Sequence, residues 1–213
     1  MSVHPFLDAD DRTRIANAIR AAEEKTSGEI YAVLAHRSDD YFFAAGFVAA
    51  CGVIIASIVA AFLAHWYWYE VSLPLFGLAI LAAFICVILV LWFVPAVRFA
   101  LVPHRIRYHR AHLNAVQQFL ARNIHVTSQR TGVLLFVSLA ERYAEVIADA
   151  GINAKVQQKD WNAIVSLLTK HASRAEVADG FVAAIEKSGK LLARHFPATG
   201  DNLNELADHL VEL

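Results

Sequence analysis

Three acidic residues stand at the ends of segments that the sequence predicts to be β-strands. Glu29 begins the first of these segments, and Glu141 and Asp149 flank the third. Ligand crevices of α/β sheets form at the carboxyl ends of parallel strands. Asp149 follows its strand and fits that position, whereas Glu29 precedes its strand and is better explained as ion-paired or solvated. Asp149 is therefore the candidate catalytic residue, with the alternative that it simply shapes the turn before Ala150 and Gly151.

Basic residues gather in one stretch, since six Arg and no acid lie between Arg98 and Ala140. This stretch begins directly after a long apolar run. An Arg beside an anionic membrane leaflet contributes on the order of 1 kcal/mol to membrane binding. The sequence therefore predicts a lipid-facing basic patch formed by four of them: Arg98, Arg105, Arg107 and Arg110. Nucleic acid is not expected as a partner, because the stretch faces a membrane and lacks interleaved aromatic residues.

Other signatures of catalysis or metal binding are weak. His109 and His112 have a spacing that could ligate a metal, but no carboxylate lies near them in the sequence. No phosphate-binding glycine loop, nucleophile elbow or zinc-ligand spacing is present. Cys51 and Cys86 both fall in apolar runs, which argues against a disulfide-bonded module and a Cys-based zinc site. We expect no metal or cofactor, with Ca²⁺ or Mg²⁺ as the alternative.

The apolar run from Tyr41 to Val97 dominates the organisation of the chain. Its two halves, 43–64 and 73–97, contain no charged residue, and each reaches the roughly 20 residues with which a helix crosses a bilayer. The turn between them, 65–72, is rich in Trp and Tyr, which favour the membrane interface. The sequence predicts a transmembrane helical hairpin; a buried hairpin of a soluble protein is the alternative.

Lys and Arg near the ends of the apolar run set the expected orientation. Arg37 precedes the hairpin and the basic stretch follows it, while the intervening turn has no Lys or Arg. The positive-inside rule then places both termini and the soluble domain in the cytoplasm, on a two-pass protein of the inner (cytoplasmic) membrane. The hairpin helices lack ionisable residues, so they are expected to act as an anchor, or to associate through Ala45, Ala49 and Gly52.

The remaining residues predict a small α/β domain. Parallel pairing is expected for the first two strands and antiparallel pairing for the third, because the connections are a helix and a tight turn. The helix after the hairpin should turn Ile106, Leu113, Val116 and Leu120 inward. The expected elements are helix 8–26, strand 29–35, helix 104–122, strand 132–139, strand 143–148, a helix around a buried Trp161, a helix opened by the capping box Ser173-Arg174-Ala175-Glu176, and a last helix carrying Leu206 and Leu210.

This order divides the chain into three stretches. Residues 1–40 hold the first helix and strand, 41–97 the hairpin, and 98–213 the remainder of the domain. Because the first two strands lie on opposite sides of the hairpin, neither half can build the sheet alone. The hairpin is therefore expected to be an insertion into one α/β domain with a small mixed sheet.

Three segments resemble the TPM domain family: Ala22 to Ile30, Thr131 to Leu139, and Phe196-Pro197 with Asn204-Glu205-Leu206. That family includes a thylakoid-lumen protein of photosystem II repair and an auxiliary subunit of a worm acetylcholine receptor. The resemblance is to the bacterial branch that carries a transmembrane hairpin after the first strand. It implies an α/β/α sandwich and, for the thylakoid member, a proposed phosphatase activity with a bound divalent cation.

The chain departs from the family where that cation chemistry is concerned. The entry segment Met1 to Leu7 lacks the family's Asp, and Arg130 and Thr131 replace a pair of Asn. Hard cations need several oxygen ligands, which Arg130 would oppose. We therefore expect a non-enzymatic accessory or interaction module for a membrane-protein partner, in contact with lipids and with the option of homo-oligomers. The alternative is a divalent-cation-dependent phosphatase or related hydrolase.

Overall fold

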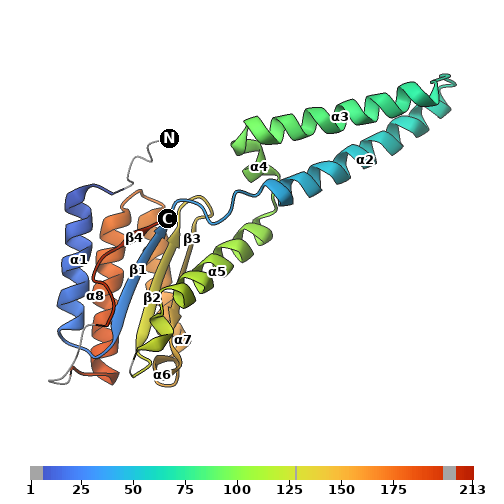
Figure 1. Cartoon of the computed structure of the whole chain (residues 1–213). Helices are drawn as coiled ribbons and strands as arrows, with labels where there is room; N and C mark the ends of the chain where they lie inside the picture. Colours follow the sequence, from blue (N-terminus) through green and yellow to red (C-terminus); the bar gives the residue numbers. More distant parts are fainter. Residues whose placement is uncertain (1–6, 128, 199–204) are drawn as a thin grey trace. The chain divides into compact units, whose positions relative to one another are not determined.

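The computed structural model describes residues 7–127, 129–198 and 205–213. The chain forms two compact units (Figure 1). The sheet unit consists of Met1–Ser38 and Tyr108–Leu213, and the hairpin unit consists of Asp39–Arg107. The chain thus leaves the sheet unit after its first strand and returns to it before its second, as expected for an insertion.

The sheet has four strands in the order β3-β2-β1-β4: β1 (Glu29–Ala35), β2 (Gly132–Ser138), β3 (Tyr143–Ala148) and β4 (Val211–Glu212). β1 runs parallel to β2 and to β4, and β3 runs antiparallel to β2. Every residue of β1 and β2 is buried, because both strands are apolar on both faces and both faces are covered. The three strands expected from the sequence and their directions are confirmed.

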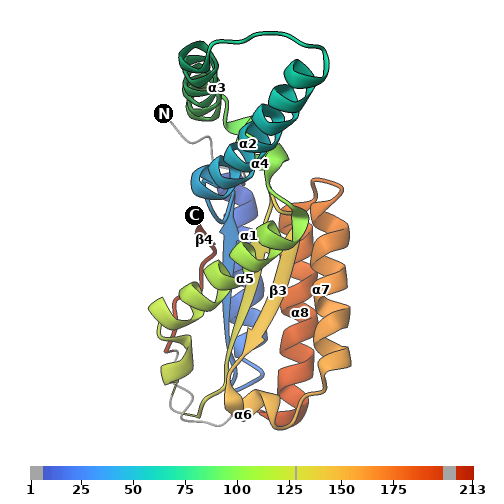
Figure 2. The same cartoon turned by 90° about the vertical axis from the view of Figure 1, so that its right-hand side faces the viewer.

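Three helices cover one face of the sheet: α1 (Ala9–Glu23), α7 (Gln158–Ala172) and α8 (Val177–His195). Figure 2 shows α7 and α8 side by side on this face. Their apolar faces bury Ile15, Phe181 and Trp161 against strand residues such as Leu34 and Leu135. The core position expected for Trp161 is confirmed. The short α6 (Ala150–Asn153) follows β3.

The opposite face of the sheet is covered by α5 (His104–Ala121) and the 3-10 turn η1 (Ile124–Val126). The expected inner face of α5 is wrong for three of its four residues: Leu113 and Leu120 are 44% and 52% exposed, and Ile106 is also exposed. Val116 is half-buried. The buried side chains are instead Ala111, Ala115 and Phe119, which follow one another at four-residue spacing. Small Ala side chains let the helix approach the sheet closely, and the larger apolar residues are left on its outer side.

Two further expectations near the C-terminus are wrong. Ser173 does not open α8; its hydroxyl donates to the carbonyl of Lys170 at the end of α7 (2.7 Å). α7 ends in the Schellman pattern, with Ala175 at φ 61° and the Glu176 N–H donating to the His171 carbonyl (3.0 Å). In place of the expected last helix, residues 205–210 form a bent, non-helical segment that leads into β4, whose backbone groups pair with β1.

The hairpin unit consists of α2 (Phe42–Trp66), α3 (Leu73–Phe93) and α4 (Pro95–Leu101). α2 and α3 are long and apolar enough to cross a membrane, with mean hydropathies of 2.6 and 3.0 over their most apolar windows. This unit continues past the expected boundary at Val97, because α4 packs back on α2 and α3. Its own small core contains Tyr41, Ala45, Leu91 and Val102.

Candidate functional site

The three segments that carry the family resemblance meet at the amino edge of the sheet, where β1 and β2 begin. Three hydrogen bonds join them: Thr131 Oγ1 to the Ser27 carbonyl (2.8 Å), Thr26 Oγ1 to the Phe196 carbonyl (2.6 Å), and the Leu206 N–H to Glu29 Oε2 (3.2 Å). Met1 to Phe6, most of the entry segment that lacks the family's Asp, lie outside the described residues, as does Asn204. These buried polar contacts fix the start of the sheet.

Two of the carboxyl groups buried at this edge, those of Glu23 and Glu29, have raised pKa values. Glu23, at the end of α1, accepts the Ile30 N–H (2.8 Å), and burial raises the pKa of Glu23 to about 8, helped by the nearby charges of Glu29 and Asp208. Burial also raises the pKa of Glu29, against the lowering effect of the Leu206 N–H. A raised pKa favours the neutral acid.

Asp149 lies at this same amino edge. Its N–H donates to the Gly132 carbonyl (2.9 Å), at the start of β2. The expected position at the carboxyl ends of the parallel strands is therefore wrong, because β3 runs antiparallel and ends where β2 begins. Asp149 is buried and serves as the N-cap of α6, with Oδ1 accepting the Ala150 N–H (2.6 Å). These contacts agree with the alternative that Asp149 shapes the turn before Ala150 and Gly151.

The carboxyl edge of the parallel strands holds Glu141 instead, with only 2% of its surface exposed. Ser138, the last residue of β2, donates its hydroxyl to this carboxylate, and the Ser38 N–H donates to Glu141 Oε1 (3.2 Å). The Ser38 and Ser138 hydroxyls are also hydrogen-bonded (2.9 Å). Glu141 thus fixes the point at which the chain leaves the sheet unit.

The histidines of α5 have an acidic neighbour that the sequence did not reveal. His112 Nδ1 lies 2.9 Å from Glu145 Oε1, and Glu145 also accepts the Tyr143 hydroxyl (2.9 Å). Burial, then the Glu145 charge, raises the pKa of Tyr143. Packing of α5 on β3 brings His112 and Glu145 together. Among residues 7–127, 129–198 and 205–213, however, no group of three or more His, Cys, Asp or Glu side chains could hold a metal ion.

The four arginines of the expected basic patch have different surroundings. Arg98 is half-buried and donates to the carbonyls of Leu91 and Trp92, the latter at 2.8 Å, at the end of α3. The Arg107 guanidinium lies 4.3 Å from the centre of the Phe99 ring. Arg105 and Arg110 are exposed. Two of the four therefore also hold the hairpin unit together.

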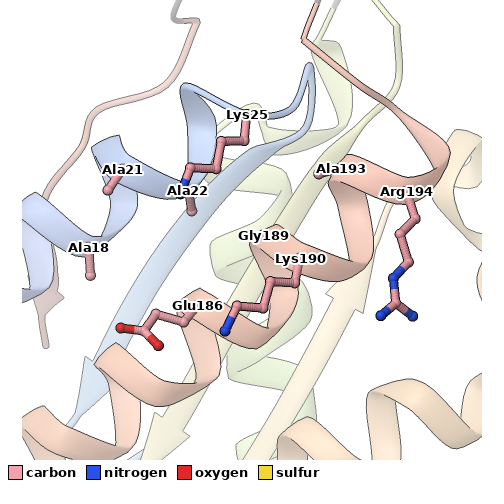
Figure 3. Close-up of a pocket in the computed structure, with 9 residues that line it drawn as sticks. All are labelled: Ala18, Ala21, Ala22, Lys25, Glu186, Gly189, Lys190, Ala193 and Arg194. Carbon is pink, nitrogen blue, oxygen red and sulfur yellow. The ribbon is translucent and has the colours of Figure 1, made fainter.

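Several hollows open on the described part of the sheet unit. The first, of about 550 Å³, lies between α1 and α8 and has a floor of small residues (Figure 3). α1 and α8 cross closely beside it: a Cβ on Gly189 would come within 2.7 Å of Ala22 Cβ. The second, of about 660 Å³, lies at the carboxyl edge between the β2–β3 turn and the α7–α8 turn. We call it the carboxyl-edge pocket.

No protein-family model matches the chain, and no curated protein matches it. The chain is similar to the NMR structure of the BA42 protein from the psychrophilic bacterium Bizionia argentinensis. The two chains are 20% identical, with a TM-score of 0.61 over 100% of this chain and 99% of BA42. At this identity the likeness shows a shared mixed α/β fold and nothing further.

Proposed function

We propose that the chain is a membrane-anchored, TPM-like α/β/α domain that acts as an accessory or interaction module for a membrane-protein partner. The observation that carries this proposal is the outer side of α5. Leu113 and Leu120 lie there seven residues apart, and both are exposed. Single exposed apolar residues are ordinary, but a row of them along one helix is typical of a surface that another molecule covers.

The anchor is the hairpin unit. α2 and α3 have the length and composition of membrane-spanning helices, and most of their large apolar side chains are exposed. Trp66, Trp68 and Tyr69, at the turn, suit a membrane interface. The Arg asymmetry supports a cytoplasmic domain and cytoplasmic termini at the inner membrane. Arg105, which is exposed, supports contact with lipid headgroups.

Photo-crosslinking in native membranes tests this function. A photoreactive amino acid replaces Leu113 on the outer side of α5 or, as the matched control, the exposed Lys159 on α7. We expect Leu113 to give a light-dependent adduct with a discrete membrane protein, or a dimer adduct if the partner is a second copy. Adducts from Lys159 that equal those from Leu113, or none from Leu113, would contradict the proposal.

One observation favours the alternative of a divalent-cation-dependent hydrolase. Asp149 Oδ2 is buried and has no hydrogen-bond partner among the described residues. A cation bound there would raise the melting temperature by mass action. Titration of the detergent-solubilised protein with Ca²⁺ or Mg²⁺ discriminates the two functions. A thermal shift that Asp149→Asn abolishes would favour the hydrolase, and its absence would leave that hydrolase without a cofactor.

A further inference from the structure

The carboxyl-edge pocket has the position of a ligand site. It opens beside Ser138, at the carboxyl end of β2, and ligand crevices of α/β sheets form at this edge. Its volume of about 660 Å³ lies within the range of small-molecule pockets. Its residues come from the β2–β3 turn with both flanking strands, and from the α7–α8 turn with the helix ends beside it. Among them are Ser138, Arg142, Thr169, Ser173 and Arg174.

The charge of this pocket comes from two arginines. Arg142 belongs to the β2–β3 turn and Arg174 to the α7–α8 turn, and both are exposed. Neither guanidinium makes a hydrogen bond or an ion pair with any of the described residues. No carboxylate is among the lining residues. The sheet therefore brings two available cations from separate turns to one hollow.

The neighbouring acids and hydroxyls are already engaged. The Glu141 carboxylate, next to Arg142 in sequence, accepts from Ser138 and Ser38. Glu176, close to Arg174, lies 3.0 Å from His171 Nδ1. The lining hydroxyls also have partners: Thr169 donates to the Val165 carbonyl and Ser173 to the Lys170 carbonyl (2.8 and 2.7 Å). The guanidiniums are thus the free donors of the pocket.

Guanidinium groups match tetrahedral oxyanions. Each presents several N–H donors in a planar fork that binds phosphate oxygens in pairs, and charge assistance strengthens these bonds. The pocket also lies at the edge where the chain leaves for the membrane helices, since only Asp39, Asp40 and Tyr41 separate Ser38 from α2. A phosphate group reaches this edge either on a lipid headgroup or on a soluble compound.

We propose that the carboxyl-edge pocket binds an anion of the phosphate class between Arg142 and Arg174, carried by an anionic lipid headgroup or by a small solute. This site is separate from the outer side of α5, where the partner of the proposed function binds. It is also separate from the four arginines around the end of the hairpin. The result of a phosphate-binding test therefore neither supports nor contradicts the proposed function.

Phosphate titration of the full chain in detergent tests the site. The test variant is Arg142→Ala/Arg174→Ala. The matched control is Arg122→Ala/Arg194→Ala, which removes the same charge from exposed positions outside the pocket. By calorimetry we expect saturable binding of inorganic phosphate that the test variant weakens by about tenfold or more and the control leaves unchanged. Absence of saturable binding, or equal weakening in both variants, would overturn the proposal.

Reconstitution separates the two sources of the anion. The full chain is placed in nanodiscs of phosphatidylcholine alone or with phosphatidylglycerol, and free phosphate is titrated into each. If headgroups occupy the pocket, phosphatidylglycerol weakens the binding of free phosphate in the wild type. If the ligand is a solute, both discs give the same phosphate affinity. Both results support the site; loss of phosphate binding in phosphatidylcholine discs would contradict it.

Discussion

The Glu23 carboxyl group accepts the backbone N–H of Ile30 at 2.8 Å and thereby joins the end of α1 to the second residue of β1. Glu23 is only 8% exposed, and burial raises its pKa to about 8, which favours the neutral acid at pH 7. In the unfolded chain a Glu titrates near pH 4.3. This carboxyl therefore binds a proton more tightly in the folded protein than in the unfolded chain.

The sign of the resulting pH dependence follows from linkage. Between about pH 4.5 and pH 8 the folded state holds a proton on Glu23 that the unfolded state releases, so stability falls as pH rises through this window. We expect the free energy of unfolding to decrease by up to a few kcal/mol across this pH range. Glu29 should add a contribution of the same sign. Urea unfolding from pH 5 to pH 9 measures this.

Glu23→Gln isolates the contribution of this carboxyl. The amide oxygen still accepts the Ile30 N–H, but the side chain no longer ionises. We expect the variant to lose much of the decline and to exceed the wild type in stability above pH 8. Glu186→Gln, at an exposed position of α8, is the control that should leave the profile unchanged. An identical decline in wild type and Glu23→Gln would show that Glu23 is ionised in the folded state.

Gly132 predicts a second measurable effect. A Cβ at this position would lie 2.2 Å from the Ile124 carbonyl oxygen, a backbone atom that moves only if η1 shifts with it. We expect Gly132→Ala to destabilise the domain by about 1–3 kcal/mol or more, measured as a fall in the denaturation midpoint. Gly46→Ala in α2, where a Cβ meets nothing within 4 Å, should be tolerated. A neutral Gly132→Ala would show that η1 can shift away from β2.

The sequence predicted the central strands well because their apolar runs determine their own burial. β1 and β3 have the expected bounds, and β2 ends one residue early, at Ser138. The α5 error has a definite cause: Leu113 and Leu120 form the more apolar row, but Ala115 on the opposite side allows the closer approach to the sheet. Apolar periodicity finds a helix and does not tell which of two apolar sides faces the core.

Other features could be located only once the strand pairing was known. Asp149 follows a strand in the sequence, and only the antiparallel pairing of β3 places it at the amino edge. The pairing of His112 with Glu145 joins α5 to β3 across 33 positions. β4 is two residues long and exists through pairing with β1. None of these three features has a local sequence signal.

Cysteine accessibility tests the predicted orientation. In a background with Cys51→Ala and Cys86→Ala, single cysteines replace Ser72, at the hairpin turn, or Ser166, on α7; both positions are exposed. With the domain in the cytoplasm, a membrane-impermeant maleimide should label Ser72→Cys in intact cells. It should label Ser166→Cys only after permeabilisation. The reverse pattern would place the domain on the other side of the membrane.

The inserted hairpin predicts that the sheet unit folds without it. β1 and β2 pair along their whole length, from Glu29 opposite Gly132 to Ala35 opposite Ser138, and α5 alone suffices as the crossover between them. Replacing Asp39 to Pro103 by a short Gly/Ser linker shortens a loop, and loop-closure free energy changes by only about 0.6 kcal/mol per doubling of length. Phe42 and Phe99, which that replacement removes, pack in the core of the hairpin unit.

We therefore expect the linker variant to be soluble and monodisperse, with a mixed α/β circular dichroism spectrum and a cooperative thermal transition. The fragment Gly132 to Leu213 should be unfolded, because it lacks β1, which pairs with both β2 and β4, and the helices α1 and α5 that cover the two faces. A linker variant that stays insoluble beside a fragment that folds alone would contradict the insertion, and would mean that β2 to β4 form a domain independent of the first strand.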